Sequence, residues 1–492
     1  MSHRRAYSIL ICYAIFAAYL FATHYRLLDL PFFWDEAGQF ISQSWDLYTR
    51  GLIIPESALP NSHTPGLPIL LAFTWKSFGY SIEITRALML LIGAAYLCAA
   101  FLLAVELLRG AHGTPAFYAA ILLAAHPLIY TQSMMAQLDL PSAVCITALF
   151  VAYTRGMERT AVACALLAVA FKETALTVPL VLGFFSWRKG DRRFASLLAG
   201  LPLLLLANWF LFLQLKTGLA FGDGEYSRYN LIYPLHPVRL GYALLRRLSF
   251  LFIENFHLLP TICLLWGISR LRFDALWKPV LWASGLYALG VSLTGGAVLE
   301  RYLLPVMPVL AAAFAAGLSV MHAKLRYGVL ALTVAGMLAC LFINMPWPYA
   351  LENNLAMVDL VEIQRNAAGL VEAKLSDRRV TTTWPLSDAL EKPYLGYVQQ
   401  RHQNVREIHE SSIEALESLD WRNGDILILY SRSWQPSLSL LSWAPARWLL
   451  DRFFEMPRDL RQGQVERLHG FRHLVGYEQR GFWVDILIVT GD

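Results

Sequence analysis

Long apolar runs recur along the sequence from residue 7 to residue 345 and limit the folds open to it. A helix of about 20 apolar residues is long enough to cross a bilayer. We identify eleven candidate runs, at residues 7–28, 85–108, 116–134, 140–153, 158–171, 174–187, 194–215, 249–268, 279–294, 302–321 and 328–345. The fourth, fifth and sixth are short, which leaves three interpretations: tilted spans, partly re-entrant spans, or spans whose true bounds differ from these. The pattern predicts a polytopic α-helical membrane protein with about 11 transmembrane helices (range 10–13).

The composition agrees with a membrane protein. Hydrophobic residues make up 57% of the chain and charged residues only 16%, whereas soluble domains carry about 25% charged residues. The net charge is +5, but the Lys and Arg residues lie in short clusters between apolar runs. Such clusters are topology signals, so we expect no nucleic-acid partner. The six cysteines all lie inside apolar runs without metal-ligand spacing, which favours small buried hydrophobes over disulfides or zinc.

Basic residues predict the orientation of the chain. With a cytoplasmic N-terminus, every cytoplasmic segment carries Lys or Arg, namely 1–6, 109–115, 154–157, 188–193, 269–278 and 322–327. A cleaved signal peptide is the alternative for the first run, but that run is long and many spans follow, so an uncleaved first helix is favoured. The outer loop 216–248 is an exception, because it is also basic and is suited to binding an anion.

The composition changes after residue 345. Residues 346–492 contain no apolar run long enough to span a membrane. Apolar spacing predicts a helix over 355–375, and "RVTTTW" (379–384), "DILILY" (425–430) and "WVDILIV" (483–489) predict strands, the last two buried. We therefore expect a membrane domain over 1–345 and an extracytoplasmic α/β domain over 346–492.

Polar residues interrupt the apolar pattern at the outer ends of several spans. The stretch "PFFWDEAGQF" (31–40) holds two adjacent carboxylates directly after the first span. Similar residues follow in "NSHTPGLP", "MAQLDLPS", "FKETA" and "LERYLLP", and the full set is Asp35, Glu36, His63, Asp139, Lys172, Glu173, Glu300, Arg301 and Tyr302. Polar groups at membrane depth are costly and point to a functional site. The predicted topology brings all of them to one face.

Each of these residues also has a purely structural interpretation. Carboxylates cap helix N-termini, adjacent opposite charges pair locally, and Arg and Tyr anchor spans at the interface. Capping applies to Asp35 with Glu36 and to Asp139, local pairing to Lys172 with Glu173, and anchoring to Arg301 with Tyr302. His63 can be an ordinary loop histidine. His126–Pro127 can be a kink in which the histidine is satisfied by hydrogen bonds. The sequence contains no phosphate-loop, HExxH, GxSxG or GxGxxG motif, so a nucleotide substrate is not indicated.

Taken in order, these motifs resemble the C-type integral-membrane glycosyltransferases. The similarity is greatest to the branch with the protein O-mannosyltransferases and the aminoarabinose transferases that modify lipid A. It covers most of residues 1–345 and rests on "WDEAGQF", "HTPGLPILLAFTWKSFGYSIEITRAL", "QLDLPSA", "FKETAL" and "ERYLLPVMP". The chain departs from the aminoarabinose branch at Gly38–Gln39, where that branch has Arg–Tyr, and at His63–Thr64, where it has Glu–Lys. The His that often follows the acidic pair in the mannosyl branch is absent too, so neither substrate carries over.

The resemblance implies a reaction and a set of roles. A sugar moves, with inversion, from a polyprenyl-phosphate donor to a lipid, glycan or protein acceptor at the outer face of the inner (plasma) membrane. Asp35 is the expected general base, or orients the acceptor if the acceptor is already anionic. Glu36 and Asp139 are expected to orient the acceptor or the sugar. The expected ligands of the lipid phosphate and sugar are His63, Lys172, Arg301 and Tyr302. No cofactor is assigned; some branches bind a divalent metal through acidic motifs, so a metal stays open.

Two other classes of protein fit part of the pattern. A transporter or a lipid or glycolipid flippase would also be polytopic, but transporters commonly have inverted repeats and broken helices at the midplane. No repeat is visible in this sequence. A non-catalytic scaffold with an external binding domain leaves the polar set unexplained.

Overall fold

The computed structural model describes residues 3–109, 114–271, 274–344, 349–409, 411–434, 443–454, 459–465 and 470–490. The chain forms two compact units. Met1–Leu28 and Gln43–Ile343 form the first, which we call the helical unit. Asp29–Ser42 and Asn344–Asp492 form the second, which we call the sheet unit.

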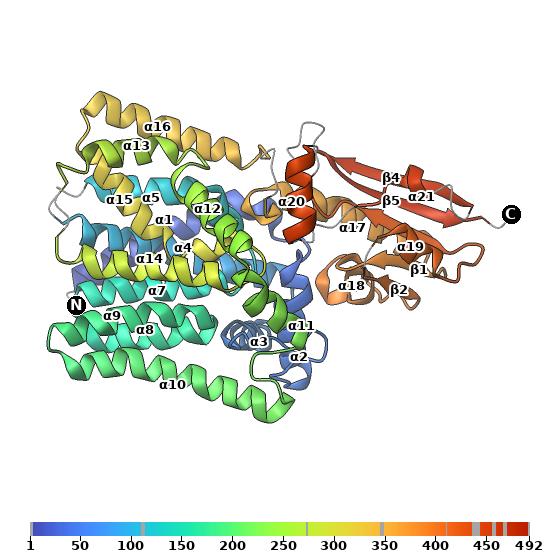
Figure 1. Cartoon of the computed structure of the whole chain (residues 1–492), viewed down its shortest axis with the longest axis horizontal. Coiled ribbons are helices and arrows are strands. Elements are labelled where there is room, and N and C mark those ends of the chain that lie inside the picture. The colour runs from blue at the N-terminus through green and yellow to red at the C-terminus, as the bar shows by residue number, and fades with distance from the viewer. Residues whose placement is uncertain are drawn as a thin grey trace. The chain divides into compact units, whose positions relative to one another are not determined.

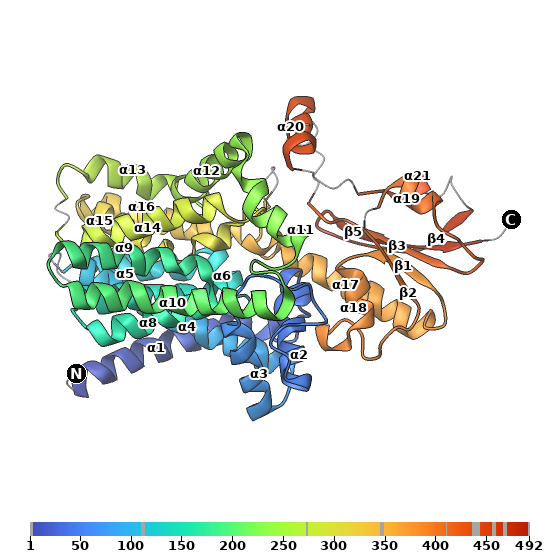
Figure 2. The same ribbon diagram turned by 60° about the horizontal axis from the view of Figure 1, so that its bottom comes forward.

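The helical unit contains most of the helices that the apolar runs predict. In chain order they are α1 (His3–His24), α2 (Ser42–Arg50), α3 (Gly66–Phe78), α4 (Ile82–Leu107), α5 (Thr114–Ala125), α6 (Pro127–Gln132), α7 (Asp139–Thr154), α8 (Glu158–Phe171), α9 (Thr177–Arg188), α10 (Arg192–Thr217), α11 (Gly224–Ser227), α12 (Pro237–Phe252), α13 (Leu258–Gly267), α14 (Trp277–Leu293), α15 (Met307–Ser319) and α16 (Ala323–Cys340). Helix α7 packs against α4 and α8, and α9 packs against α10 and α14 (Figures 1 and 2).

Local sequence determines where these helices begin and end. The Ser81 hydroxyl accepts a hydrogen bond from the Ile84 N–H at 3.1 Å and caps α4. The Asp191 carboxylate does the same for α10, accepting from Phe194 N at 3.1 Å. Helix α10 ends at Gly218, whose φ of +74° suits glycine. Both helices are therefore bounded by the residue types that satisfy free backbone groups.

Length and composition alone identify four described helices that could cross a membrane: Tyr7–Leu27, Ile82–Leu107, Arg192–Thr217 and Ala323–Cys340. Several other predicted spans are shorter or interrupted. The run 116–134 divides into α5 and α6, because Pro127 begins a new helix after His126. The run 249–268 divides between α12 and α13.

The kink expected at His126–Pro127 is confirmed as the break between α5 and α6, whereas the expected hydrogen bonds of the histidine are not found among the described residues. Among the described residues, neither ring nitrogen of His126 has a hydrogen-bond partner, although the side chain is buried. The ring instead packs against Phe250 and His257, with centroids 5.7 and 5.0 Å away. The His126 ring is therefore enclosed by ring side chains at the break between α5 and α6.

The sheet unit contains a mixed five-stranded sheet with the strand order β2-β1-β3-β5-β4. Its strands are β1 (Val380–Thr383), β2 (Val405–Ile408), β3 (Ile426–Tyr430), β4 (Phe471–Gln479) and β5 (Phe482–Val489). Strand β1 is parallel to β2 and β3, whereas β5 is antiparallel to β3 and β4. Helix α17 (Ala356–Lys374) packs on β4 and β5, and α18 (Leu386–Glu391) packs on β1 and β2. The helix predicted at 355–375 and the three predicted strands are confirmed as α17, β1, β3 and β5.

The segment Asp29–Ser42 clusters with the sheet unit rather than with the helices that flank it in sequence. The Phe32 N–H donates to the Leu395 carbonyl at 3.1 Å. The Tyr397 hydroxyl donates to the Phe32 carbonyl, also at 3.1 Å. The connection between α1 and α4 is therefore divided: its acidic start belongs to the sheet unit and the rest, from Gln43, belongs to the helical unit.

Candidate active site

A buried carboxylate and two buried cations meet in the helical unit. Asp139 is the first residue of α7, Lys172 directly follows α8, and Arg301 lies in the short 3₁₀ helix Glu300–Leu303. The Arg301 Nε donates to Asp139 Oδ2 at 3.1 Å, and the Lys172 ammonium pairs with Asp139 Oδ1. All three residues are at most 3% exposed. The structure therefore places three of the predicted site residues in one cluster, which we call the Asp139 trio.

The two cations of the Asp139 trio contact the same carboxylate, one at each of its oxygens. The Tyr302 ring lies beside it, with the Lys172 Nζ 3.9 Å from the ring centroid, a cation–π distance. Buried charges are stable only when they are paired and hydrogen-bonded. An anion with several acceptor oxygens, such as a phosphate monoester, fits this charge pattern.

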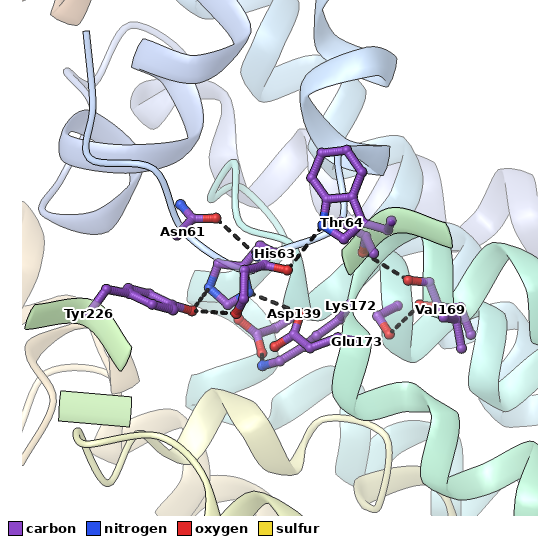
Figure 3. A network of polar contacts seen from close by, with 12 residues as sticks. Asn61, His63, Thr64, Asp139, Val169, Lys172, Glu173 and Tyr226 are labelled. Carbon is purple, nitrogen blue, oxygen red and sulfur yellow. Dashed lines mark hydrogen bonds and ion pairs between the residues drawn. The ribbon is translucent and has the colours of Figure 1, made fainter. Parts of the chain in front are cut away.

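A second network surrounds His63. Its Nδ1 lies 3.0 Å from Glu173 Oε2, and its Nε2 lies 3.2 Å from the Tyr226 hydroxyl (Figure 3). An N–H at Nδ1 that donates to the carboxylate leaves Nε2 to accept from Tyr226. Glu173 therefore fixes the orientation of His63 and pairs with it rather than only with its neighbour Lys172. Tyr226 was not predicted as a site residue; it lies in the short helix α11, within the segment 216–248 whose basic residues alone drew attention.

The loop that carries His63 is tied to the loop that carries Tyr226. Asn61 and Gly222 form an isolated antiparallel bridge, and Asp223 N donates to the Pro60 carbonyl at 2.9 Å. Gly222 has a φ of +83°, and a Cβ there would lie 2.8 Å from the Asn61 Cα. Glycine is therefore required by both conformation and space. The Thr64 hydroxyl anchors the same loop to α8 by donating to the Val169 carbonyl at 2.8 Å (Figure 3).

Two cations of the basic segment 216–248, Arg246 and Arg247, contact other groups of the helical unit. The Arg246 Nε contacts Glu300 Oε1 at 2.5 Å, and its Nη1 donates to the Tyr242 hydroxyl at 3.2 Å. Arg247 donates to the carbonyls of Val291 and Leu299 at 2.9 and 3.2 Å. These contacts hold α12 against the segment that carries Arg301.

Asp35 and Glu36 belong to the sheet unit and are described within it. Glu36 is fully buried, and its Oε2 accepts a hydrogen bond from Phe33 N at 3.0 Å. Asp35 precedes the π-helical turn Glu36–Ile41 but makes no side-chain capping hydrogen bond to it. The capping interpretation therefore does not describe Asp35. It does not describe Asp139 either, since that side chain lies one residue inside α7 and pairs with the two cations.

The described residues contain no group of three His, Cys, Asp or Glu side chains arranged to hold a metal ion. The functional groups of the candidate site are carboxylates, cations, a histidine and tyrosine hydroxyls.

The fold is similar to that of a solved membrane protein. It resembles the crystal structure of ArnT from Cupriavidus metallidurans bound to undecaprenyl phosphate, with a TM-score of 0.56 and 13% sequence identity over 99% of this chain and 98% of that chain. The apo structure of the same protein gives a TM-score of 0.53 and 12% identity over 98% of both chains. These similarities confirm the fold that the sequence motifs predict. No protein-family model matches the sequence, and no curated protein matches it significantly.

Proposed function

We propose that the protein is a membrane glycosyltransferase that moves a sugar from a polyprenyl-phosphate donor to an extracytoplasmic lipid, glycan or protein. The observation that carries the proposal is the Asp139 trio, in which two buried cations, Lys172 and Arg301, both contact the Asp139 carboxylate. The trio occurs in a fold shared with ArnT, and one ArnT structure has undecaprenyl phosphate bound. The protein would lie in the inner membrane with its N-terminus in the cytoplasm and its sheet unit outside.

The proposed reaction is a single displacement at the anomeric carbon of the donor sugar. The acceptor oxygen forms a bond to the anomeric carbon, and the bond from that carbon to the donor phosphate oxygen breaks with inversion. Asp35 takes the proton of the acceptor hydroxyl, and Glu36 and Asp139 orient the acceptor or sugar. The departing lipid phosphate gains negative charge, which Lys172 and Arg301 stabilise, with His63 and Tyr302 beside them.

The direct test uses the full-length protein in liposomes with a panel of polyprenyl-phosphate sugars and a membrane extract as acceptor. We expect one donor to be consumed, with release of polyprenyl phosphate and a mass increase on one acceptor class. Mass spectrometry of lipids, glycans and glycoproteins from cells with and without the gene identifies that acceptor. Movement of an intact glycolipid between leaflets without transfer would instead support the flippase alternative and contradict the proposal.

A further inference from the structure

The turn that carries the acidic pair is packed against a tryptophan of the sheet unit. Trp384 lies between β1 and α18, and its ring meets that of Trp34 edge-on, with centroids 5.2 Å apart and planes at 76°. A Cβ on Gly38 would lie 2.5 Å from the Trp384 Cζ2. Only a residue without a side chain allows this approach, so Gly38 and Trp384 fit together as a pair.

Hydrogen bonds hold both ends of the same segment on the sheet unit. At its start, the Phe32 N–H donates to the Leu395 carbonyl, and the Phe32 carbonyl accepts from the Tyr397 hydroxyl. At its end, the Ser42 hydroxyl lies 3.2 Å from the Tyr394 hydroxyl. The acidic pair is therefore held in the middle of a segment that is attached at each side.

The backbone between these attachments has an unusual conformation. Trp34 has a φ of +45°, which is unfavourable for a residue with a side chain. The π-helical turn Glu36–Ile41 follows at once. Strained backbone persists only where the surroundings hold it, and such turns often occur at functional sites. Trp384 and the Phe32 contacts supply those surroundings, and Glu36 closes the turn through Phe33 N.

We propose that the sheet unit is a positioning element of the enzyme, in which Trp384 holds the acidic turn and so fixes the direction of the Asp35 carboxylate. The inference rests on the proposed function, in which Asp35 takes the proton of the acceptor. It gives residues 346–492 a part in the reaction. Trp384 acts through Asp35 and is a positioning residue rather than a catalytic one. A misplacement of about 1 Å costs on the order of 10²-fold in rate.

The first experiment compares Trp384→Ala, Trp384→Phe and the wild type as full-length proteins in liposomes. We expect Trp384→Ala to lower kcat by on the order of 10²-fold while binding of polyprenyl phosphate stays unchanged. Hydrogen exchange in residues 29–42 should rise in the same variant. Trp384→Phe keeps an aromatic ring and should restore most of kcat. The matched control is Trp443→Ala, a 63% exposed tryptophan of the same unit, which should change neither quantity.

The second experiment uses the fit between Gly38 and Trp384. Gly38→Ala should lower kcat, and the double variant Gly38→Ala with Trp384→Leu should recover part of it, because the smaller side chain leaves room for the new methyl group. Additive losses in the double variant would contradict direct packing between the two positions.

The outcomes separate the two proposals. If wild-type protein shows no transfer with any donor, the proposed function fails and the positioning role fails with it, whereas the exchange data still report whether Trp384 holds the segment. If the wild type is active and Trp384→Ala loosens residues 29–42 without lowering kcat, the positioning role alone is overturned. A parallel loss of thermal stability and phosphate binding in Trp384→Ala would also overturn it, in favour of a purely structural role.

Discussion

The Arg301 guanidinium donates to the Asp139 carboxylate at 3.1 Å although 162 residues separate them in the sequence. Lys172 takes the other oxygen of the same carboxylate. Each partner lies at the end of a helix or in a short helical turn, so three separate connections of the helical unit converge on one carboxylate. Replacing any one member changes the charge balance of the other two, which makes the trio accessible to experiment.

Arg301 tests the binding of lipid phosphate. A guanidinium can donate to two phosphate oxygens at once, whereas an ammonium acts as a point charge. We expect Arg301→Lys to weaken binding of polyprenyl phosphate to purified protein and Arg301→Ala to weaken it further. Arg188→Ala, at an exposed position, is the control. Unchanged binding in both Arg301 variants would leave Arg301 as an interfacial anchor and a partner of Asp139.

Asp139→Asn removes the charge that the two cations share. Removing one partner of a buried ion pair typically costs about 3–5 kcal/mol, so we expect a clear fall in Tm. Polyprenyl phosphate should raise the Tm of this variant more than that of the wild type, because the phosphate replaces the lost negative charge. Asp191→Asn keeps a capping side chain on α10 and should behave like the wild type. Equal stabilisation of both proteins by the lipid would show that the phosphate binds elsewhere.

Asp35→Asn tests the general base. Because Asp35 makes no capping hydrogen bond in the structure, the loss of a helix cap is not an alternative cause of inactivity. Transfer should fall by about 10²–10⁴-fold while the Tm and lipid-phosphate binding stay unchanged. The control is Asp29→Asn in the same segment, where the exposed carboxylate lies 3.3 Å from Arg365. Near-normal turnover by Asp35→Asn would reject the assignment.

Gly222→Ala tests the contact between the loops that carry His63 and Tyr226. A methyl group there would lie 2.8 Å from the Asn61 Cα, and the backbone strain of a positive φ adds about 1–2 kcal/mol. We expect faster hydrogen exchange in residues 57–66 and reduced transfer. Gly218→Ala is a close control, because Gly218 has a φ of +74° but nothing within 4 Å of its Cβ. If Gly218→Ala and Gly222→Ala change hydrogen exchange and transfer equally, backbone strain alone explains the effect of Gly222→Ala.

The orientation of the chain is tested by reporter fusions at Asp492 and within the loop 188–193. The basic segments predict that the reporter at Asp492 lies outside and the reporter in the loop lies in the cytoplasm. Two cytoplasmic signals would contradict the odd number of spans and the shared outer face of the polar residues.

Sequence patterns predict the parts of this fold that depend on local hydrophobicity. Strands β3 and β5 have almost continuous burial, and their apolar runs identify them. Strand β2 has only four residues with two charges, and β4 contains an interior glycine, so neither has a strong strand signal. The break at His126–Pro127 is marked in the sequence by its proline, whereas the residues between α12 and α13 contain no proline, and hydropathy does not reveal that break.

The residues of the candidate site also differ in how well the sequence predicts them. Asp139, Lys172 and Arg301 stand out in the sequence because charges among apolar residues are unusual. Tyr226 and Trp384 have no such contrast with their neighbours. Tyr226 contacts His63, 163 positions away, and Trp384 contacts Trp34, which is equally remote in the sequence. The docking of Asp29–Ser42 on the sheet unit is likewise a long-range arrangement that no local pattern encodes.

Lys172 and Glu173 are neighbours in the chain, yet one pairs with Asp139 and the other with His63. A single peptide bond thus joins the two polar networks of the helical unit. A change in the backbone at this one position would therefore disturb both the Asp139 carboxylate and the His63 imidazole, although the two side chains belong to separate networks.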